Sequence, residues 1–273
     1  MNNKYRIFIC AHKNIQFDYS KIGVNSDHYT ILAQSNDVKS EYCDVIDISD
    51  DEFVREHKVG YSELCSIHYL YTHQDLVKDL DYIGICHYRR FYVDLLIPGA
   101  IINEEVVTTN KRYLWHDNYS EYADYHYIKH WNILCDIIKT FHNQYYGAFT
   151  EMMYAKDMHH CNMVVLPKHL FFEYCEFLFD VFDKFDKLIG IKNDEESIKY
   201  ASTIINELSE HAYKDKYYQA RIQGFLSERL TDVFIRKISE SYSIYETKMM
   251  KLITPEDDRN NWEGSLLVLN VKN

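Results

Sequence analysis

The chain has 273 residues, of which 47% are hydrophobic and 15% aromatic, and its formal net charge at pH 7 is -12. This length allows one substantial α/β core. The acidic balance argues against a nucleic-acid-binding surface, because contacts to phosphates need clustered positive charge. The seven cysteines are scattered and form no C-x-x-C pair, a pattern typical of reduced intracellular thiols. No secretory signal or long apolar run is evident, so we expect a cytoplasmic protein.

The first third of the chain alternates predicted strands with a predicted helix. Short apolar runs predict strands over 5–10, 29–33 and 45–48. Helical spacing of apolar residues then predicts a helix from 61 to about 77, and a further apolar run predicts a strand over 81–86. Strand, helix and strand in this order indicate βαβ units and a mainly parallel sheet.

The remainder of the chain is predicted to be largely helical. Its pattern predicts helices over 128–141, 170–185 and 221–238 and one buried strand over 161–166. No internal repeat or low-complexity linker marks a boundary. We therefore predict a single domain over residues 1–245, followed by a polar tail, 246–273.

Polar side chains follow the strand predicted over 81–86. They are His87, Tyr88, Arg89 and Arg90. Ligands of open α/β sheets bind at the carboxyl ends of the strands, and the planar, permanently charged guanidinium group suits a diphosphate. We expect at least one of the two arginines to contact a ligand phosphate; the alternative is that Arg90 is only a surface ion-pair partner.

Several sequence boxes, in this order, resemble a family of bacterial capsule and O-antigen glycosyltransferases, long catalogued as a domain of unknown function, whose hallmark is an H-Y-R-R box at a strand end. The boxes are IFICAHK at 7–13, YSEL at 61–64, YIGICHYRRF at 82–91, NMVV at 162–165, EYCEFLFD at 173–180 and GFLSERL at 224–230. The resemblance implies a GT-A-like, Rossmann-type α/β fold, with a mainly parallel sheet flanked by helices, and a nucleotide-sugar donor. The first loop departs from the family pattern at Asn14 and Ile15, where an aromatic residue or a proline is expected.

The resemblance also implies a donor site. In such a fold His12 and Lys13 would contact uridine or phosphate, and the Asn162 amide would bind sugar hydroxyls. The implied donor-binding residues are His12, Lys13, Glu63, His87, Arg89, Arg90, Asn162 and Arg229. The alternatives are a solvated lysine for Lys13, a charge that favours the helix dipole for Glu63, and a turn asparagine for Asn162.

A carboxylate is expected to serve as the general base, and Glu228 in the GFLSERL box is the candidate; the alternative is a solvent-facing glutamate. GT-A enzymes generally carry a metal-binding D-x-D motif where this chain has His87-Tyr88-Arg89, and the D-x-D at 79–81 precedes the strand. We therefore predict that arginine charge replaces metal charge and that no cofactor is required. A divalent metal is the alternative.

The predicted function is transfer of a hexose, galactose or galactofuranose, from a UDP-sugar to a surface polysaccharide or a lipid-linked glycan, with transient contact to the inner membrane and no nucleic-acid partner. The aromatic residues Trp115, Tyr119, Tyr122 and Trp131 are candidates for an acceptor platform; the alternative for at least half of them is a place in the core or the cleft wall. One alternative is a metal-dependent hydrolase built on the His-rich middle of the chain. The other is a non-catalytic carbohydrate-binding subunit.

Overall fold

The computed structural model describes residues 4–14, 27–92, 97–159, 161–253 and 266–270. Its centre is a large sheet. Seven of its strands are β1 (Tyr5–Ala11), β2 (Tyr29–Ala33), β3 (Asp44–Asp47), β4 (Tyr82–His87), β6 (Val106–Thr109), β9 (Val164–Pro167) and β10 (Ile244–Thr247). They follow one another across the sheet in the order β10-β6-β9-β4-β1-β2-β3.

The remaining strands are short additions. β5 (Arg90–Tyr92) and β11 (Met249–Ile253) pair with each other, β5 also pairs with β4, and β12 (Leu266–Asn270) pairs with β11. A separate small sheet joins β7 (Arg112–Tyr113) to β8 (Asp157–Met158). Segments of 246–273, predicted as a polar tail, thus take part in the sheet, while the domain division at residue 245 stays a prediction.

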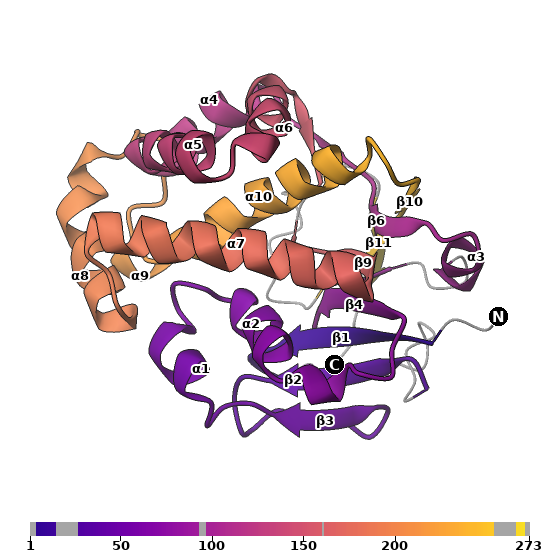
Figure 1. Cartoon of the computed structure of the whole chain (residues 1–273). Coiled ribbons are helices and arrows are strands. Elements are labelled where there is room, and N and C mark those ends of the chain that lie inside the picture. The colour runs from indigo at the N-terminus through magenta and orange to yellow at the C-terminus, as the bar shows by residue number, and fades with distance from the viewer. Residues whose placement is uncertain (1–3, 15–26, 93–96, 160, 254–265, 271–273) are drawn as a thin grey trace.

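The sheet is mostly parallel, as predicted. β1 is parallel to both β2 and β4, and β2 is parallel to β3. Two strands depart from this direction: β9 runs antiparallel to β4 and to β6, and β5 runs antiparallel to β4 and to β11. The arrows of β1, β2 and β3 accordingly point the same way in Figure 1. The carboxyl ends of β1 and β4 therefore meet at one edge, which is where the predicted site residues follow.

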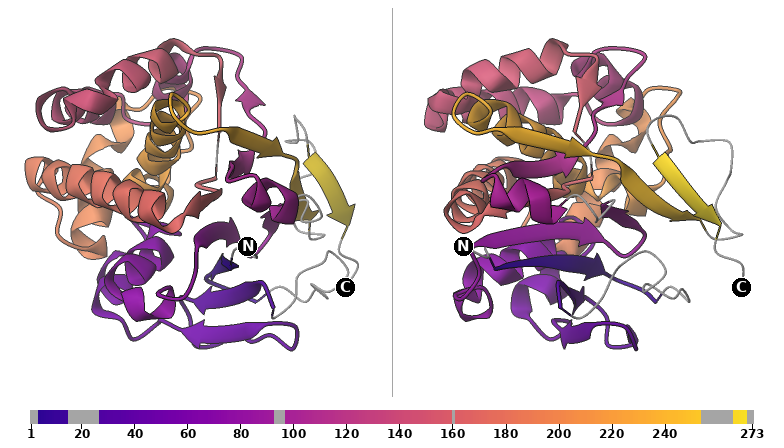
Figure 2. Two further views of the ribbon diagram at one scale, coloured as in Figure 1. Left: turned by 45° about the vertical axis from the view of Figure 1, so that its right-hand side comes forward. Right: turned by 90° about the vertical axis from the view of Figure 1, so that its right-hand side faces the viewer.

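Helices cover the sheet, and most of them form a second layer on one face of it (Figure 1). They are α1 (Glu52–His57), α2 (Leu64–Thr72), α3 (Ile97–Ile102), α4 (Asn118–Tyr125), α5 (Lys129–Phe141), α6 (Asn143–Tyr154), α7 (Lys168–Ile189), α8 (Asp194–Ile204), α9 (Lys216–Gln219) and α10 (Ile222–Ile238), with 3₁₀ turns at Gln74–Leu76 and Ile205–Glu207. In Figure 1, α7 crosses between strands β1 to β3 and helices α4 to α6. Figure 2 shows β11 and β12, in gold and yellow, on the side of the molecule away from α5 and α7.

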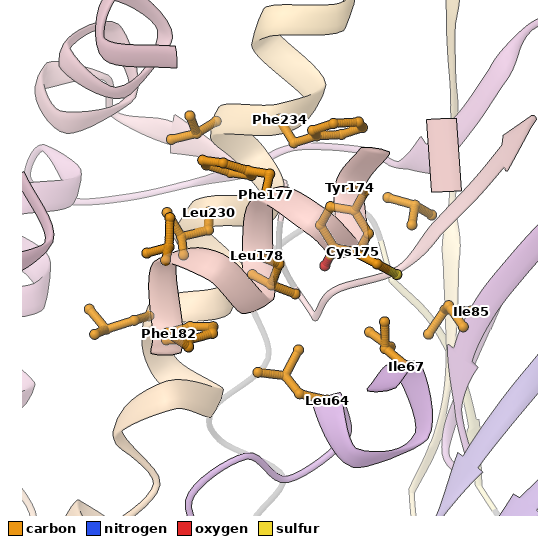
Figure 3. Close-up of a cluster of buried hydrophobic side chains, with 14 of the residues drawn as sticks. Leu64, Ile67, Ile85, Tyr174, Cys175, Phe177, Leu178, Phe182, Leu230 and Phe234 are labelled. Carbon is orange, nitrogen blue, oxygen red and sulfur yellow. The ribbon is translucent and has the colours of Figure 1, made fainter. Parts of the chain in front are cut away.

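Alternating side chains of the strands fill two cores, one on each face of the sheet. On β1, Phe8 and Cys10 point to the larger core, whereas Ile7 and Ile9 point to the smaller one. The larger core packs α2, α7 and α10 against the sheet. Figure 3 shows this packing, with Leu64, Ile67, Ile85, Tyr174, Cys175, Phe177, Leu178, Phe182, Leu230 and Phe234 in one cluster.

The predicted elements exist, with boundaries that shift by a few residues. The strand at 29–33 has the predicted limits, and the helix predicted at 128–141 begins one residue later. The helix predicted from residue 61 begins at Leu64, because Ser62 has a left-handed φ of 52°. Among the described helices, none combines the length and the apolar character that a membrane span requires.

Candidate active site

The loops after β1 and β4 bring predicted site residues together. Cys10 of β1 pairs with His87 of β4, so His12 and Lys13 leave the sheet beside Tyr88 and Arg89. The His12 and Tyr88 rings meet edge to face with centroids 4.7 Å apart, and the Tyr88 hydroxyl lies 3.4 Å from His12 Nε2. The guanidinium carbon of Arg89 lies 5.5 Å from the centre of the Tyr88 ring. His12 and Lys13 are exposed, and Arg89 is half-buried.

Arg90 begins β5, opposite Lys251 of β11, and is half-buried. The pKa of its guanidinium is raised, and the largest cause is the neighbouring Cys161 thiol. Burial acts to lower this pKa, and the charges of Glu228 and Glu63 act to raise it. Arg90 therefore lies within electrostatic reach of two carboxylates that come from distant parts of the sequence. This half-buried position differs from the surface position that the alternative prediction gave to Arg90.

The turn before α2 places Glu63 and Ser62 at the same edge. Gln34 Nε2 donates a hydrogen bond to the Ser62 carbonyl at 3.0 Å, which supports the left-handed backbone there. Arg221, at the start of α10, donates from Nε to Ser62 Oγ at 3.1 Å. Arg221 also lowers the pKa values of His12 and His87 through its positive charge, after the larger effect of burial in each case. A third arginine thus belongs to the cluster.

Asn162 is fully buried and its side-chain amide is engaged by protein groups. Its Nδ2 donates to Glu63 Oε1 and to Ser227 Oγ, both at 2.8 Å, and its Oδ1 accepts a 2.7 Å bond from Thr231. Thr231 is in turn bonded to the Tyr174 hydroxyl at 2.8 Å. The predicted strand-leading asparagine therefore links the Glu63 carboxylate to α10.

His87 is buried on the α2 side of β4. Its Nε2 donates a hydrogen bond to the Cys161 carbonyl and lies 4.0 Å from Glu63 Oε1. Burial and then the charge of Arg90 lower the pKa of His87 to about 4. The imidazole is thus neutral at neutral pH, and it orients the backbone of Cys161 and Asn162, both of which have left-handed φ values, 70° and 49°.

The two charged residues of the GFLSERL box form an ion pair, with Arg229 Nη1 3.6 Å from Glu228 Oε2, but they differ in exposure. Glu228 keeps 29% of its side chain exposed. Arg229 is buried, donates from Nη1 to the Phe225 carbonyl at 2.9 Å, and stacks its guanidinium carbon 5.5 Å above the Tyr122 ring. Arg229 therefore has its contacts with α4 and α10, whereas Glu228 remains accessible.

Sequence reasoning did not single out Arg221, Ser62 or Ser227. Each lies in or just before a box that the resemblance had marked, YSEL or GFLSERL, so a signal was present. Their contribution depends on a close approach of two backbones: Gly224 N donates to Gly60 O at 3.0 Å, and a Cβ at Gly224 would lie 3.2 Å from Ser62 Oγ. Such a crossing is not visible in a single sequence.

Among the described histidines of the middle third, His126 and His130 are core residues, whereas His116 is exposed. His126 stacks on Phe225 with centroids 4.0 Å apart, and His130 Nε2 lies 3.1 Å from the Tyr200 hydroxyl. Burial lowers the pKa of each to about 3. Across the described residues, no group of three or more His, Cys, Asp or Glu side chains is arranged to hold a metal ion.

The aromatic residues suggested as an acceptor platform divide between core and surface. Tyr122 and Trp131 are fully buried, whereas Trp115 is 78% exposed. A groove of about 860 Å³ lies elsewhere, along α6 and next to Arg236, and none of the predicted site residues lines it.

Comparisons with known proteins show which solved structures this fold resembles. The chain matches the apo structure of the bifunctional glycosyltransferase WbbM with a TM-score of 0.69 and 19% identity, covering 91% of this chain and 45% of WbbM, so it spans less than half of that protein. It also matches the mannosyltransferase Ktr4p from S. cerevisiae over 67% of this chain and 62% of that one, with 12% identity and a TM-score of 0.33, too low to bear on the fold. No curated protein matches the chain.

The mixed α/β fold with its mostly parallel sheet is therefore a glycosyltransferase fold. A family model described as a domain of unknown function, DUF4422, matches residues 6–212. This is most of the chain, and the chain therefore belongs to the DUF4422 family.

Proposed function

We propose that this protein is a glycosyltransferase that moves a hexose from a UDP-sugar to a glycan acceptor. The observation that carries the proposal is the convergence of Arg89, Arg90 and Arg221 at the carboxyl edge of the parallel sheet, beside the carboxylates Glu63 and Glu228. Three guanidinium groups supply the charge and the paired donors that a diphosphate needs. The shared fold with WbbM supports the same class of activity.

The residues divide into those that bind and those that position. Arg89, Arg90 and Arg221, with His12 and Lys13 at the margin, hold the diphosphate and uridine. Because the amide of Asn162 is occupied by Glu63, Ser227 and Thr231, it acts by fixing the Glu63 carboxylate, which faces the donor sugar.

The reaction is a displacement at the anomeric carbon. The acceptor oxygen forms a bond to that carbon, and the bond from the carbon to the diphosphate oxygen breaks, so that the electron pair leaves with UDP. Glu228, accessible and close to Arg90, takes the proton of the acceptor hydroxyl. Arginine charge stabilises the leaving diphosphate in the role that a divalent metal has in other enzymes.

The substrate details are extensions of the same proposal. The hexose is galactose, in pyranose or furanose form, and the acceptor is a surface polysaccharide or a lipid-linked precursor of one. A lipid-linked acceptor brings the protein into transient contact with the inner face of the cytoplasmic membrane.

A ligand panel tests the class. Thermal unfolding is measured with UDP, UDP-galactose, UDP-glucose, GDP and CMP, each with EDTA and with Mn²⁺. We expect stabilisation by the UDP compounds in EDTA, of about 2.7 kcal/mol at a hundred times the dissociation constant. Arg90→Lys should weaken this effect, because an ammonium cannot form the paired contact, whereas Arg112→Lys, on a half-exposed side chain, should not.

Two results would count against the proposal. If no nucleotide diphosphate raises the unfolding temperature, the transferase assignment is wrong. If stabilisation and turnover both vanish in EDTA and return with Mn²⁺, the arginines do not replace a metal.

A further inference from the structure

A cluster of aromatic rings lies beside Glu228, outside the proposed donor site. Tyr218 of α9 packs against Phe225 of α10 with centroids 5.1 Å apart, and Tyr213 meets Tyr218 edge to face at 5.4 Å. His126 stacks on Phe225 from the other side at 4.0 Å. These four rings therefore pack into one continuous cluster beside the first turns of α10.

This cluster differs from the core in its exposure. Tyr213 is 66% exposed, and Tyr218 and Phe225 are half-buried, whereas only His126 is fully covered. Arg221, Phe225 and Glu228 lie on one face of α10, because they are spaced four and three residues apart. The guanidinium carbon of Arg221 lies 5.4 Å from the centre of the Phe225 ring. The aromatic surface is thus continuous with the arginine cluster.

Glu228 is within electrostatic range of both regions. Burial raises the pKa of Tyr218, and the charge of Glu228 acts in the same direction; this charge also acts on buried His87 and on Arg90. On α10, Glu228 shares a face with Phe225 of the aromatic cluster and with Arg221 of the arginine cluster. This is the position that a general base needs if the donor binds on one side and the acceptor on the other.

Packing of α9 does not account for the exposed rings. Gln219 is buried and already anchors α9, because its Nε2 donates to the carbonyls of Tyr125 and Tyr213 at 3.1 and 2.9 Å. Its Oε1 lies 3.4 Å from His126 Nδ1. The side chain of Tyr213 contributes a largely solvent-facing ring that this anchoring does not use.

We propose that Tyr213, Tyr218 and Phe225 bind the acceptor as a saccharide, by stacking on the apolar C–H face of its ring. The inference rests on the proposed transferase function and names the substrate class of the same site. Aromatic faces offer large, rigid apolar area at low entropic cost, and a neighbouring carboxylate accepts hydrogen bonds from hydroxyls. A sugar seated on these rings presents a hydroxyl to Glu228.

Saturation-transfer difference NMR tests the platform without knowledge of the natural acceptor. The probes are methyl β-galactopyranoside, methyl α-glucopyranoside and methyl α-mannopyranoside, each with saturating UDP, whose own signal reports the donor site. We expect signals from at least one glycoside, strongest for its C–H protons. Tyr213→Ala and Tyr218→Ala should weaken its binding about fivefold to tenfold, the factor expected for an aromatic contact of about 1 kcal/mol or slightly more.

Matched variants distinguish an effect of losing the aromatic ring from an effect of losing the folded structure. Tyr218→Phe keeps the ring and should bind as the wild type does. Tyr154→Ala removes a similarly exposed tyrosine, 68% exposed, from α6 and should have no effect. Tyr213→Ala changes a solvent-facing side chain, so it should fold even where Tyr218→Ala does not.

The outcomes distinguish the two proposals. Glycoside signals that Tyr213→Ala leaves unchanged, or no glycoside signal from any probe, would overturn the saccharide platform. If UDP gives no signal but glycosides bind in a ring-dependent manner, the platform stands as a saccharide site and the transferase proposal fails.

Discussion

Glu228 and Glu63 are two carboxylates near one arginine cluster, yet their surroundings differ. Glu63 accepts a hydrogen bond from the buried Asn162, and its side chain is 11% exposed. Glu228 is more accessible, at 29%, and its ion-pair partner Arg229 is 3.6 Å away. A group that accepts a proton from an incoming acceptor needs access, and this difference favours Glu228 over Glu63 for the proposed role of general base.

Replacement of this base gives the first prediction. Glu228→Gln should lower kcat for sugar transfer by about a hundredfold to ten-thousandfold, the usual contribution of a general base. The dissociation constant for UDP should change little. Steady-state kinetics and calorimetric titration with UDP provide the two measurements, and Glu210→Gln, on a side chain that is 90% exposed, is the control. A variant with unchanged kcat would remove Glu228 from the chemistry.

Asp186 shows how a buried carboxyl couples the site's supporting turns to pH. It accepts hydrogen bonds from the Tyr61 hydroxyl at 2.7 Å and from Gln223 Nε2 at 2.5 Å, and so ties the turn before α2 to α10. Burial raises its pKa to about 6, although both hydrogen bonds act in the opposite direction. The folded protein therefore holds this proton at a pH where the unfolded chain has released it.

The sign of the pH effect follows. Between the unfolded pKa of about 3.9 and the folded value of about 6, the folded state binds more protons, so this group makes stability fall as pH rises. Asp186→Asn should remove this slope. The free energy of unfolding of the variant should therefore rise, relative to that of the wild type, by about 2 to 3 kcal/mol between pH 4 and pH 7. Urea unfolding at several pH values measures it. A parallel pH profile in the two proteins would show that Asp186 does not titrate in this range.

At the scale of the elements, close packing in the sheet is most demanding at Gly84 on β4. A Cβ there would lie 2.8 Å from Ile7 Cγ1 and 3.1 Å from Val165 Cγ2, on the two neighbouring strands. Ile7 is fully buried, and its β-branched side chain is stiff, so it cannot easily move aside. The absence of a side chain at this position therefore allows β1, β4 and β9 to pack at their observed spacing.

Gly84→Ala should consequently destabilise the fold by about 1 to 3 kcal/mol, the usual cost of overpacking. Gly147→Ala is the matched control, since a Cβ there meets nothing within 4 Å and the residue lies inside helix α6. That change should be neutral or stabilising by up to about 1 kcal/mol. Chemical denaturation of both variants gives the comparison, and equal effects would contradict the packing argument.

The elements themselves were largely predictable from sequence. A buried strand such as 29–33 is predicted by its short, mainly apolar run. Helix α10 is predicted by its inner stripe, Leu226, Leu230, Val233 and Phe234, all of which are buried. The strands from Ile244 onward were missed. β10 has intermediate burial and a polar composition, IYET, so that its pairing with β6 depends on a neighbour distant in sequence.

The site was predictable only in part, for a similar reason. Residues that directly follow a strand, His12 or Arg89, can be placed by the rule that parallel strands end at one edge. The role of Asn162 as a link between Glu63 and α10 depends on three segments that meet in space. No spacing within one segment reveals such a meeting point.

Across the whole molecule, a buried charge network joins the late strands to the helical layer. His159 Nδ1 lies 2.7 Å from Asp232 Oδ1, and His159 Nε2 lies 3.1 Å from Glu246 Oε1 of β10. Arg236 donates from Nε to Asp232 at 2.8 Å and from Nη2 to Asp157 at 2.7 Å. Asp232 is fully buried. Through its partners His159 and Arg236, this side chain of α10 is connected to β8, to β10 and to the loop before β9.

The pKa shifts define when this network stabilises the fold. Burial alone would lower the pKa of His159, but its bonds to Asp232 and Glu246 raise it above the ordinary value. The pKa of Asp232 is lowered: burial acts to raise it, and the bond from His159 and the charge of Arg236 outweigh that effect. The His159 contribution is present below about pH 6.5 and is lost as pH rises through the raised value.

Asp232→Asn should destabilise the protein by about 3 to 5 kcal/mol near pH 6, because it leaves buried positive charge without its partner. The loss should shrink at higher pH as wild-type His159 gives up its proton. Asp183→Asn, which affects an exposed pair with Lys187, should cost less than about 1 kcal/mol and serves as control. Similar losses in both variants, or a loss that does not depend on pH, would refute the network's role.

The left-handed backbone at Ser62, Cys161 and Asn162 has a consequence for evolution in the laboratory. Each such residue costs about 1 to 3 kcal/mol relative to a relaxed conformation, and all three lie at the edge of the proposed donor site. Asn162 is held by the bonds of its side chain to Glu63, Ser227 and Thr231, which glycine would lose. Selection for heat resistance alone should therefore favour glycine at Ser62 and Cys161, and the resulting variants should be more stable but slower in sugar transfer. Durability and turnover compete at these two positions.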